Sequence, residues 1–180
     1  MAVVVPANKS VEALEGLHLY HGAISNCSMR VRMTLVEKGL DWTSHHLDLK
    51  KKENVSEHYF GINPNGLVPT LVHDGVVHIE SNEIIDYLDE TFQEPALRAK
   101  NSTETNDWLR LATSLHVPAV KPYVYATVIA PKVKKTVEEE ARYANLQKNK
   151  QLKDFHAQHA GGKTFSDADR KGVVEGKSVD

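Results

Sequence analysis

Cysteine is nearly absent from this 180-residue chain, which contains only Cys27. One thiol can form neither an internal disulfide nor a zinc ribbon, so we expect no metal site and a reducing, cytoplasmic location. The chain also lacks a strong excess of either charge, with a formal net charge of −2, and we expect no nucleic-acid partner. No apolar run approaches the roughly 20 residues that span a bilayer. No basic residue precedes the apolar stretch 2–7, as it would in a signal peptide, so no membrane partner is expected.

The two halves of the chain differ in charge and composition. Residues 1–93 carry a net charge of −6 and contain β-branched runs and turn residues. Residues 94–180 carry a net charge of +4 and are rich in Lys, Glu, Gln and Ala. Because the change falls near residues 93–99, we predict two structural units, one over residues 15–92 and one over residues 100–180.

The first unit alternates between strand and helix patterns. Gly39 follows the first helical pattern as a C-terminal stop, Asp74-Gly75 is a strong hairpin signal, and we expect Ser81 to cap the last helix. The order β-α-β-α-β-β-α is the thioredoxin-like layout, although periodicity alone does not separate it from other small α/β units. The expected elements are strands at 17–20, 42–47, 70–72 and 76–79, and helices from 25, 56 and 81.

The second unit has helix patterns only. Asn101 and Glu104 have the spacing of a capping box at the start of a helix. Trp108, Leu111, Ala112 and Leu115 form its apolar stripe. Prolines interrupt helices, so we expect a kinked or broken segment between residues 117 and 130. The prolines in question are Pro118, Pro122 and Pro131.

Residues 132–158 predict one long, mostly solvated helix with a partly uncovered apolar face. That face contains Val133, Val137, Ala141 and Ala144, with Tyr143 and Leu146 near its margin. The segment 166–169 resembles a further capping box, but only 11 residues follow it. We therefore expect an incomplete helical domain whose exposed face lowers stability or drives self-association.

Cys27 lies where a strand ends and a helix begins. A thiol there is close to the positive end of the helix dipole, and the hydroxyls of Ser25 and Ser28 can donate hydrogen bonds to a thiolate. The position also suits a small buried core cysteine. No second cysteine follows at the C-x-x-C spacing, so a dithiol oxidoreductase is excluded.

Two other segments allow both a structural and a functional interpretation. Val68-Pro69 precedes the third strand, where most prolines are trans. Glu80-Ser81 opens the last helix of the first unit. Its free N–H groups, helix dipole and hydroxyl form either a plain N-cap or a seat for a carboxylate ligand.

The segment 25–32, Ser-Asn-Cys-Ser-Met-Arg-Val-Arg, closely resembles the S-x-C-S-x-R-V-R motif of zeta-class glutathione transferases. It also resembles a segment of tetrachlorohydroquinone reductive dehalogenases. Order and spacing agree over residues 17–92. This resemblance implies a thioredoxin-like domain followed by an all-α C-terminal domain, together the glutathione transferase fold. The other matching segments are 37–41, 63–71, 74–75, 80–81 and 84–88.

The resemblance assigns catalytic positions at the start of the first helix. Ser25 and Cys27 match the family's catalytic serine and cysteine, one of which stabilises the thiolate of bound glutathione. Asn26 stands where many members have a second serine, and it keeps the capacity to form hydrogen bonds. Glutathione is therefore the expected co-substrate.

The resemblance also assigns the rest of the glutathione site. Val68 matches the residue before a cis-proline, here Pro69, whose backbone pairs with the cysteinyl part of glutathione, so we predict a cis Val68-Pro69 bond. Glu80 and Ser81 match the pair that holds the γ-glutamyl end. From charge alone, we expect the glycine carboxylate to meet Lys50 or Lys52.

In the family, the helical domain lines a second site for the electrophile. We therefore predict a detoxifying glutathione transferase-like enzyme, a homodimer, acting on a small hydrophobic electrophile by conjugation, isomerisation or reductive dehalogenation. The alternative is a non-catalytic binding or assembly module of the same fold. Candidates for the electrophile site are Trp108, Leu111, His116 and Tyr123.

Overall fold

The computed structural model describes residues 2–98, 103–115, 121–125 and 135–158. The chain divides into two compact units. The first combines Met1–Leu97 with Ala141–Asn149, and the second combines Arg98–Glu140 with Lys150–Asp180. Among the described residues, no helix combines the length and apolar character needed to cross a bilayer.

A five-stranded mixed sheet forms the centre of the first unit, with the strand order β1-β5-β4-β2-β3. Strands β2 and β3 are parallel, as expected for a strand–helix–strand crossover, and the other pairs are antiparallel. The order predicted for residues 17–92 is confirmed, and β1 is an addition that the sequence did not suggest. The strands are β1 (Val3–Val4), β2 (Leu17–His21), β3 (Thr43–His46), β4 (Thr70–His73) and β5 (Val76–His78).

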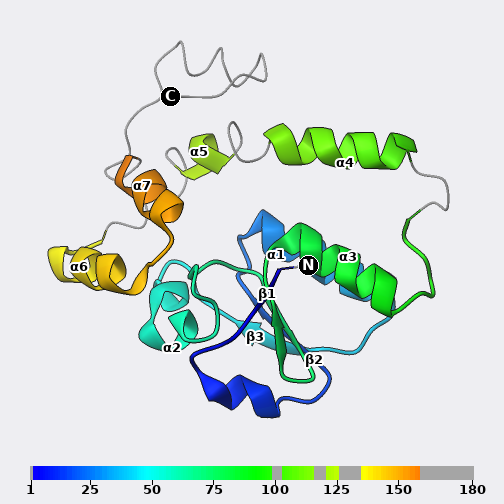
Figure 1. The fold of residues 1–180 in the computed structure, drawn as a ribbon, viewed down its shortest axis with the longest axis horizontal. Helices are drawn as coiled ribbons and strands as arrows, with labels where there is room; N and C mark the ends of the chain where they lie inside the picture. The colour runs from blue at the N-terminus through cyan, green and yellow to red at the C-terminus, as the bar shows by residue number, and fades with distance from the viewer. Residues whose placement is uncertain (1, 99–102, 116–120, 126–134, 159–180) are drawn as a thin grey trace. The chain divides into compact units, whose positions relative to one another are not determined.

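Helices cover both faces of this sheet. Helices α1 and α3 pack against each other on one face and run side by side in Figure 1. The short helices η1 and α2 contribute to a second core. The bounds are η1 (Lys9–Ala13), α1 (Asn26–Glu37), η2 (Glu53–Val55), α2 (Glu57–Phe60) and α3 (Ser81–Thr91).

The alternation of side chains along the strands divides the apolar residues between two cores. In β4, Leu71 faces the core with α1 and α3, while its neighbour Val72 faces the core with η1 and α2. The first core contains Leu17, Leu19, Val31, Leu35, Leu71, Ile84 and Leu88. The second contains Val11, Tyr59, Ile62, Val72, Val77 and Ile79.

The predicted hairpin is present, and its turn explains the Asp-Gly pair. Asp74 has a φ of 46° and Gly75 a φ of 79°, the positive values that a tight two-residue hairpin turn requires. A Cβ on Gly75 would lie 2.5 Å from the carbonyl oxygen of Glu12, so η1 packs directly on this turn. The N-terminal segment is thereby fixed to the hairpin.

The start of α3 corrects one prediction. Ser81 is the first residue of the helix, and the N-cap is Glu80, whose side chain makes no capping hydrogen bond. Glu80 has a φ of 65°. Only two residues separate β5 from α3, so the chain turns sharply at Glu80 and enters the helix one residue earlier than a capping Ser81 would allow.

The single long helix predicted over 132–158 is wrong, because two helices are present. Helix α6 (Val137–Leu146) ends before Gln147, and α7 (Lys150–Gln158) begins three residues later. Gln147 is fully buried, its Nε2 donates to the Asn65 carbonyl at 2.9 Å, and its Oε1 accepts the N–H of Asn149 at 2.9 Å. These hydrogen bonds interrupt the helix.

The described part of the apolar face expected in this segment is uncovered, as predicted, and the correction concerns Tyr143. Val137, Ala141 and Ala144 are exposed, whereas Tyr143, placed at the margin, is buried beside Phe60. The remaining helices are α4 (Thr103–Leu115) and α5 (Lys121–Val124). Several predicted features lie outside the described residues: the Asn101 cap, Pro118, Pro131, Val133 and the capping box at 166–169.

Candidate functional site

Ser25 is the N-cap of α1. Its backbone is extended, and its Oγ accepts a hydrogen bond from the N–H of Ser28 at 3.1 Å. This bond uses an oxygen lone pair, so the hydroxyl hydrogen can still be donated to an anion in front of the helix. Ser28 itself is buried, and its Oγ accepts the N–H of Gly22 at 3.3 Å. Of the two hydroxyls considered in the sequence, Ser25 lies at the helix mouth and Ser28 lies in the core.

Cys27 is in the first turn of α1 and is partly exposed, unlike a fully buried core cysteine. The guanidinium of Arg30, one turn further along the helix, donates from Nη2 to its Sγ at 3.3 Å. The other terminal nitrogen, Nη1, donates to Oδ1 of Asn82 at 2.5 Å. The sulfur therefore lies beside a positive charge that also contacts α3.

The Val68-Pro69 bond is cis, as predicted. Tyr20 pairs with Thr70 in the register of β2 and β4, so the proline precedes β4 at the sheet end where β2 leads toward Ser25. This register explains how segments more than 40 positions apart in the sequence come to the same end of the sheet.

Buried polar side chains hold the loop before Pro69. Tyr59 donates from its hydroxyl to the Leu67 carbonyl at 2.6 Å and lies 2.8 Å from Thr70 Oγ1. Asn63 donates from Nδ2 to the same carbonyl at 2.9 Å and to the same hydroxyl at 2.8 Å. Burial raises the pKa of Tyr59 well above its usual value, so the phenol stays neutral. The loop is thus fixed by directional bonds in a dry environment.

Glu80 and Ser81 lie at the start of α3. The φ of 65° at Glu80 is unusual for a residue with a side chain, and such backbone strain costs on the order of 1–3 kcal/mol and clusters at functional sites. Ser81 is buried and Glu80 is exposed. The Arg30–Asn82 bond brings this helix start next to that of α1. Two helix N-termini, each the positive end of a helix dipole, therefore lie close together.

His21 ends β2 directly before this region. Its Nε2 lies 2.7 Å from Ser44 Oγ, and its Nδ1 is buried and has no hydrogen-bond partner among the described residues. Burial, with Arg32, His46 and His45 nearby, lowers the pKa of His21 to about 4. A neutral His21 therefore adds no positive charge at neutral pH.

The structure also gives the positions of the other predicted site residues that it describes. Asn26 is exposed in the first turn of α1, and Lys52 lies in the loop before η2 with a φ of 62°. Trp108, Leu111 and Tyr123 belong to the second unit and are exposed. His116 lies outside the described residues.

Sequence reasoning missed Arg30, Tyr59 and Asn63. Arg30 could have been found from its spacing, because residues three apart on a helix are neighbours and Cys27 is its partner. For Tyr59, nothing in the pattern distinguishes a core aromatic residue from one that orients a distant loop.

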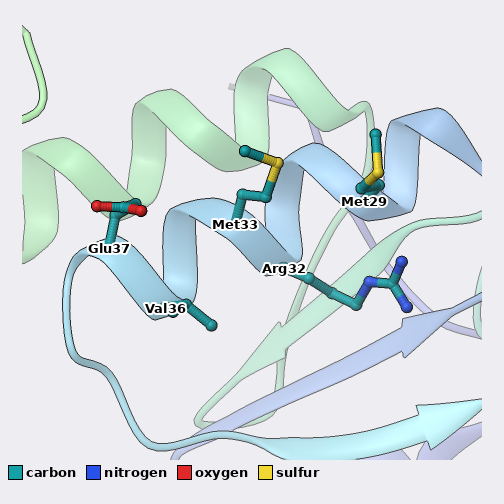
Figure 2. A pocket seen from close by; sticks show the side chains of 5 residues that line it. All are labelled: Met29, Arg32, Met33, Val36 and Glu37. Carbon is teal, nitrogen blue, oxygen red and sulfur yellow. The ribbon is translucent and has the colours of Figure 1, made fainter.

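A separate surface hollow of about 270 Å³ lies on the outer face of α1. Figure 2 shows its five lining residues: Met29, Arg32, Met33, Val36 and Glu37. None of them is a predicted glutathione-binding residue. The hollow is slightly smaller than the roughly 300–1,000 Å³ typical of small-molecule sites.

The Glutathione S-transferase, N-terminal domain, family model matches residues 24–91. Glutathione S-transferase GstA of Escherichia coli O157:H7 is 34% identical over 141 residues, covering 72% of this chain and 67% of that protein. The chain belongs to the glutathione S-transferase family. The match with GstA decides this, because it extends through most of both proteins.

The alignments with two further relatives cover smaller shares of those proteins. Glutathione S-transferase 1 of Dianthus caryophyllus is 42% identical over 81 residues, 45% of this chain and 37% of that protein. Glutathione S-transferase TCHQD of Arabidopsis thaliana is 32% identical over 113 residues, 57% of this chain and 42% of that protein. These alignments span about two fifths of each relative.

Solved glutathione S-transferase structures share the fold. The β-etherase LigF from Sphingobium sp. strain SYK-6 superimposes with a TM-score of 0.74 at 25% identity, over 89% of this chain and 68% of that one. A bacterial maleyl pyruvate isomerase of the zeta class gives a TM-score of 0.52 at 26% identity, over 72% and 61%. The thioredoxin-like fold class expected from the sequence is therefore confirmed.

Proposed function

We propose that this protein is an enzyme that binds glutathione and activates its thiolate for attack on a small electrophile. The observation that carries the proposal is the geometry of Ser25. As N-cap of α1 it accepts the Ser28 N–H and keeps its hydroxyl hydrogen for a ligand. A thiolate there gains one hydrogen bond and the positive end of a helix dipole, both of which favour the ionised form.

The other parts of glutathione bind to the loop before Pro69 and to the start of α3. The Val68 backbone before Pro69 pairs with the cysteinyl part, and Glu80 and Ser81 hold the γ-glutamyl end. The fixed loop and the adjacent helix starts support this assignment, because a peptide with charged ends needs directional donors at both. Asn26 borders the thiol, and Lys52 meets the glycine carboxylate.

In conjugation, the sulfur of glutathione forms a bond to an electrophilic carbon, and the leaving group departs with the electron pair of the broken bond. Ser25 donates a hydrogen bond to the thiolate and is not consumed. In a reductive reaction, the glutathione thiolate first displaces the leaving group and forms a C–S bond to the substrate. The Cys27 thiolate then attacks that sulfur, the C–S bond breaks, and its electron pair goes to the substrate carbon, which takes up a proton. A second glutathione thiolate attacks the disulfide between Cys27 and the first glutathione and releases glutathione disulfide and the Cys27 thiolate. The two glutathione thiols supply the two electrons that the substrate gains.

The electrophile site belongs to the helical part of the chain. We assign Trp108, Leu111, His116 and Tyr123 to it, as aromatic and apolar groups that suit a small hydrophobic substrate. The active form is a homodimer. The similarity to maleylacetoacetate isomerase of Pseudomonas aeruginosa, 40% identical over 84 residues, supports isomerisation as one of the proposed reaction types.

The test is retention of the full chain on immobilised glutathione, with elution by free glutathione, followed by a panel of electrophiles. The panel contains a halogenated aromatic ring, a cis-configured diketo acid, an aryl ether and a generic conjugation substrate. We expect retention and turnover of at least one of them. Retention without any turnover would favour a non-catalytic binding module, and absence of retention would overturn the proposal.

A further inference from the structure

Arg30 joins the starts of two helices through a single side chain. Its Nη2 donates to Cys27 Sγ at 3.3 Å, and its Nη1 donates to Asn82 Oδ1 at 2.5 Å. Cys27 is the second residue of α1, and Asn82 is the second residue of α3. Because a guanidinium is planar and rigid, the two nitrogens hold both partners at a fixed separation.

The other described contacts between these helices are apolar packing and one ion pair at their far ends, between Lys38, just after α1, and Asp89 of α3. Val31 and Leu35 of α1 share a core with Ile84 and Leu88 of α3. The hydrophobic effect is non-directional, so apolar burial holds the helices together without orienting the polar groups at their starts. Hydrogen bonds from a charged donor are directional and about twice as strong as neutral ones. The Arg30 bonds therefore determine how the two helix starts are aligned.

We propose that Arg30 is a positioning residue that sets the distance between the two ends of the glutathione site. The inference rests on the proposed function, in which the thiol lies at Ser25 and the γ-glutamyl group lies at Glu80 and Ser81. Glutathione binds tightly only when both groups meet their partners at once. Arg30 supplies this alignment without contacting glutathione itself.

Neither the charge nor the size of Arg30 alone is sufficient for this role. Lysine keeps the charge, but its single nitrogen at the end of a flexible chain cannot hold both partners in one plane. Arg32, two positions further along α1, offers a matched control, because it lines the surface hollow in Figure 2 instead of the glutathione site.

The experiment is titration calorimetry of the full chain with reduced glutathione, for wild type and five variants. The variants are Arg30→Ala, Arg30→Lys, Asn82→Ala, the Arg30→Ala/Asn82→Ala double variant, and Arg32→Ala. We expect Arg30→Ala to weaken binding about tenfold and Asn82→Ala about threefold, as for lost hydrogen bonds to a charged group. The double variant should be about tenfold weaker, not about thirtyfold, because both residues act through one link.

Arg30→Lys should remain several-fold weaker than wild type, and Arg32→Ala should bind like wild type. Thermal midpoints of the same samples separate alignment from general packing. Loss of alignment lowers glutathione affinity while the midpoint stays near that of Arg32→Ala, whereas loss of packing lowers the midpoint as well.

Several results would overturn the inference while leaving the proposed function intact. These are full recovery of binding by Arg30→Lys, additive losses in the double variant, equal binding by Arg30→Ala and wild type, or a binding loss that merely follows the thermal midpoint. Failure of the wild-type protein to bind glutathione would instead overturn the proposed function, and this inference with it.

Discussion

Gln147 donates a hydrogen bond from Nε2 to the backbone carbonyl of Asn65, 82 positions earlier in the chain, at 2.9 Å. The side chain is fully buried, and Asn149 adds a second contact by donating from Nδ2 to Asn65 Oδ1 at 3.3 Å. A late segment of the chain thereby supports the loop that leads to Val68 and Pro69.

We predict that Gln147→Leu lowers the free energy of unfolding by about 2 kcal/mol, because it removes a buried donor from the partly buried Asn65 carbonyl. Gln147→Glu should be at least as destabilising, since a carboxylate would then face that carbonyl. Urea denaturation gives both values, with the exposed Lys148→Met as control. If Gln147→Leu were as stable as Lys148→Met, the loop would not depend on this contact.

Ser25 has two proposed roles, capping α1 and donating a hydrogen bond to the thiolate, and two replacements separate them. Ser25→Ala removes both the cap and the donor, and it should cost about 1 kcal/mol of stability as well as raise the pH at which bound glutathione ionises. Ser25→Asp keeps an acceptor for the Ser28 N–H but puts a carboxylate beside the thiolate, so it should fold normally and still fail to activate glutathione. Absorbance of the bound thiolate as a function of pH measures this. Normal thiolate formation in Ser25→Asp would contradict the donor role.

Cys27 is expected to matter for reduction and not for conjugation. Cys27→Ser removes the sulfur that forms a disulfide with glutathione, so reductive turnover should stop while simple conjugation continues. Mass spectrometry of the wild-type protein with glutathione disulfide should show one added glutathione, and the variant should show none. Reductive turnover that survives in Cys27→Ser would make the cysteine only a packing residue.

Buried histidines should make the protein sensitive to acid. Burial lowers the pKa of His21 from 6.5 to about 4, and burial with the nearby His73 lowers that of His78. On acidification, these two histidines therefore bind protons more readily in the unfolded chain than in the folded chain. The stabilising contribution of His21 is fully present above pH 6.5 and is lost as the pH falls from about 6.5 toward about 4, and that of His78 is lost in the same direction.

For His21 this loss should amount to about 1–2 kcal/mol after allowance for solvent screening. Urea midpoints at several pH values between 7.5 and 4.5 measure it. His21→Gln should flatten the pH dependence relative to wild type. An unchanged slope in that variant would show that His21 is protonated equally well in the folded state.

Lys38 and Asp89 form a buried ion pair, with 2.6 Å between Nζ and Oδ1 and no exposure of the lysine side chain. Lys38 also donates to the carbonyl of Pro95 at 2.8 Å. Lys38→Met should therefore lower stability by about 3 kcal/mol, because the carboxylate loses its cation in a buried setting. The exposed Lys51→Met is the control in chemical denaturation. Equal stability of the two variants would show that the ion pair contributes nothing.

The sequence predicted the elements of the first unit well where local signals were strong. The Asp74-Gly75 pair dictates its own turn, and Gly39 ends α1 in the left-handed conformation that glycine tolerates. The two-residue strand β1 was not predictable, because Val3 and Val4 show no period and become a strand only by pairing with β5. Its existence depends on a partner that no local pattern reveals.

The glutathione site was predicted mainly from the motif resemblance, and less from hydrophobic periodicity and residue chemistry. Periodicity located the start of α1 and therefore Ser25 and Cys27, but it could not bring Arg30 and Asn82 together. The break between α6 and α7 was missed for a similar reason. Residues 132–158 have strong helix propensity throughout, and the tertiary contact of Gln147 with Asn65 outweighs it.

Strand β1 pairs with β5 so that Val3 lies opposite His78, 75 positions later. During synthesis the first strand leaves the ribosome well before its partner has been made. At roughly 5–20 residues per second, it waits on the order of 4–15 s. Of the five strands, the one made earliest is thus the last that can enter the sheet, because its only neighbour in the sheet is the strand made last.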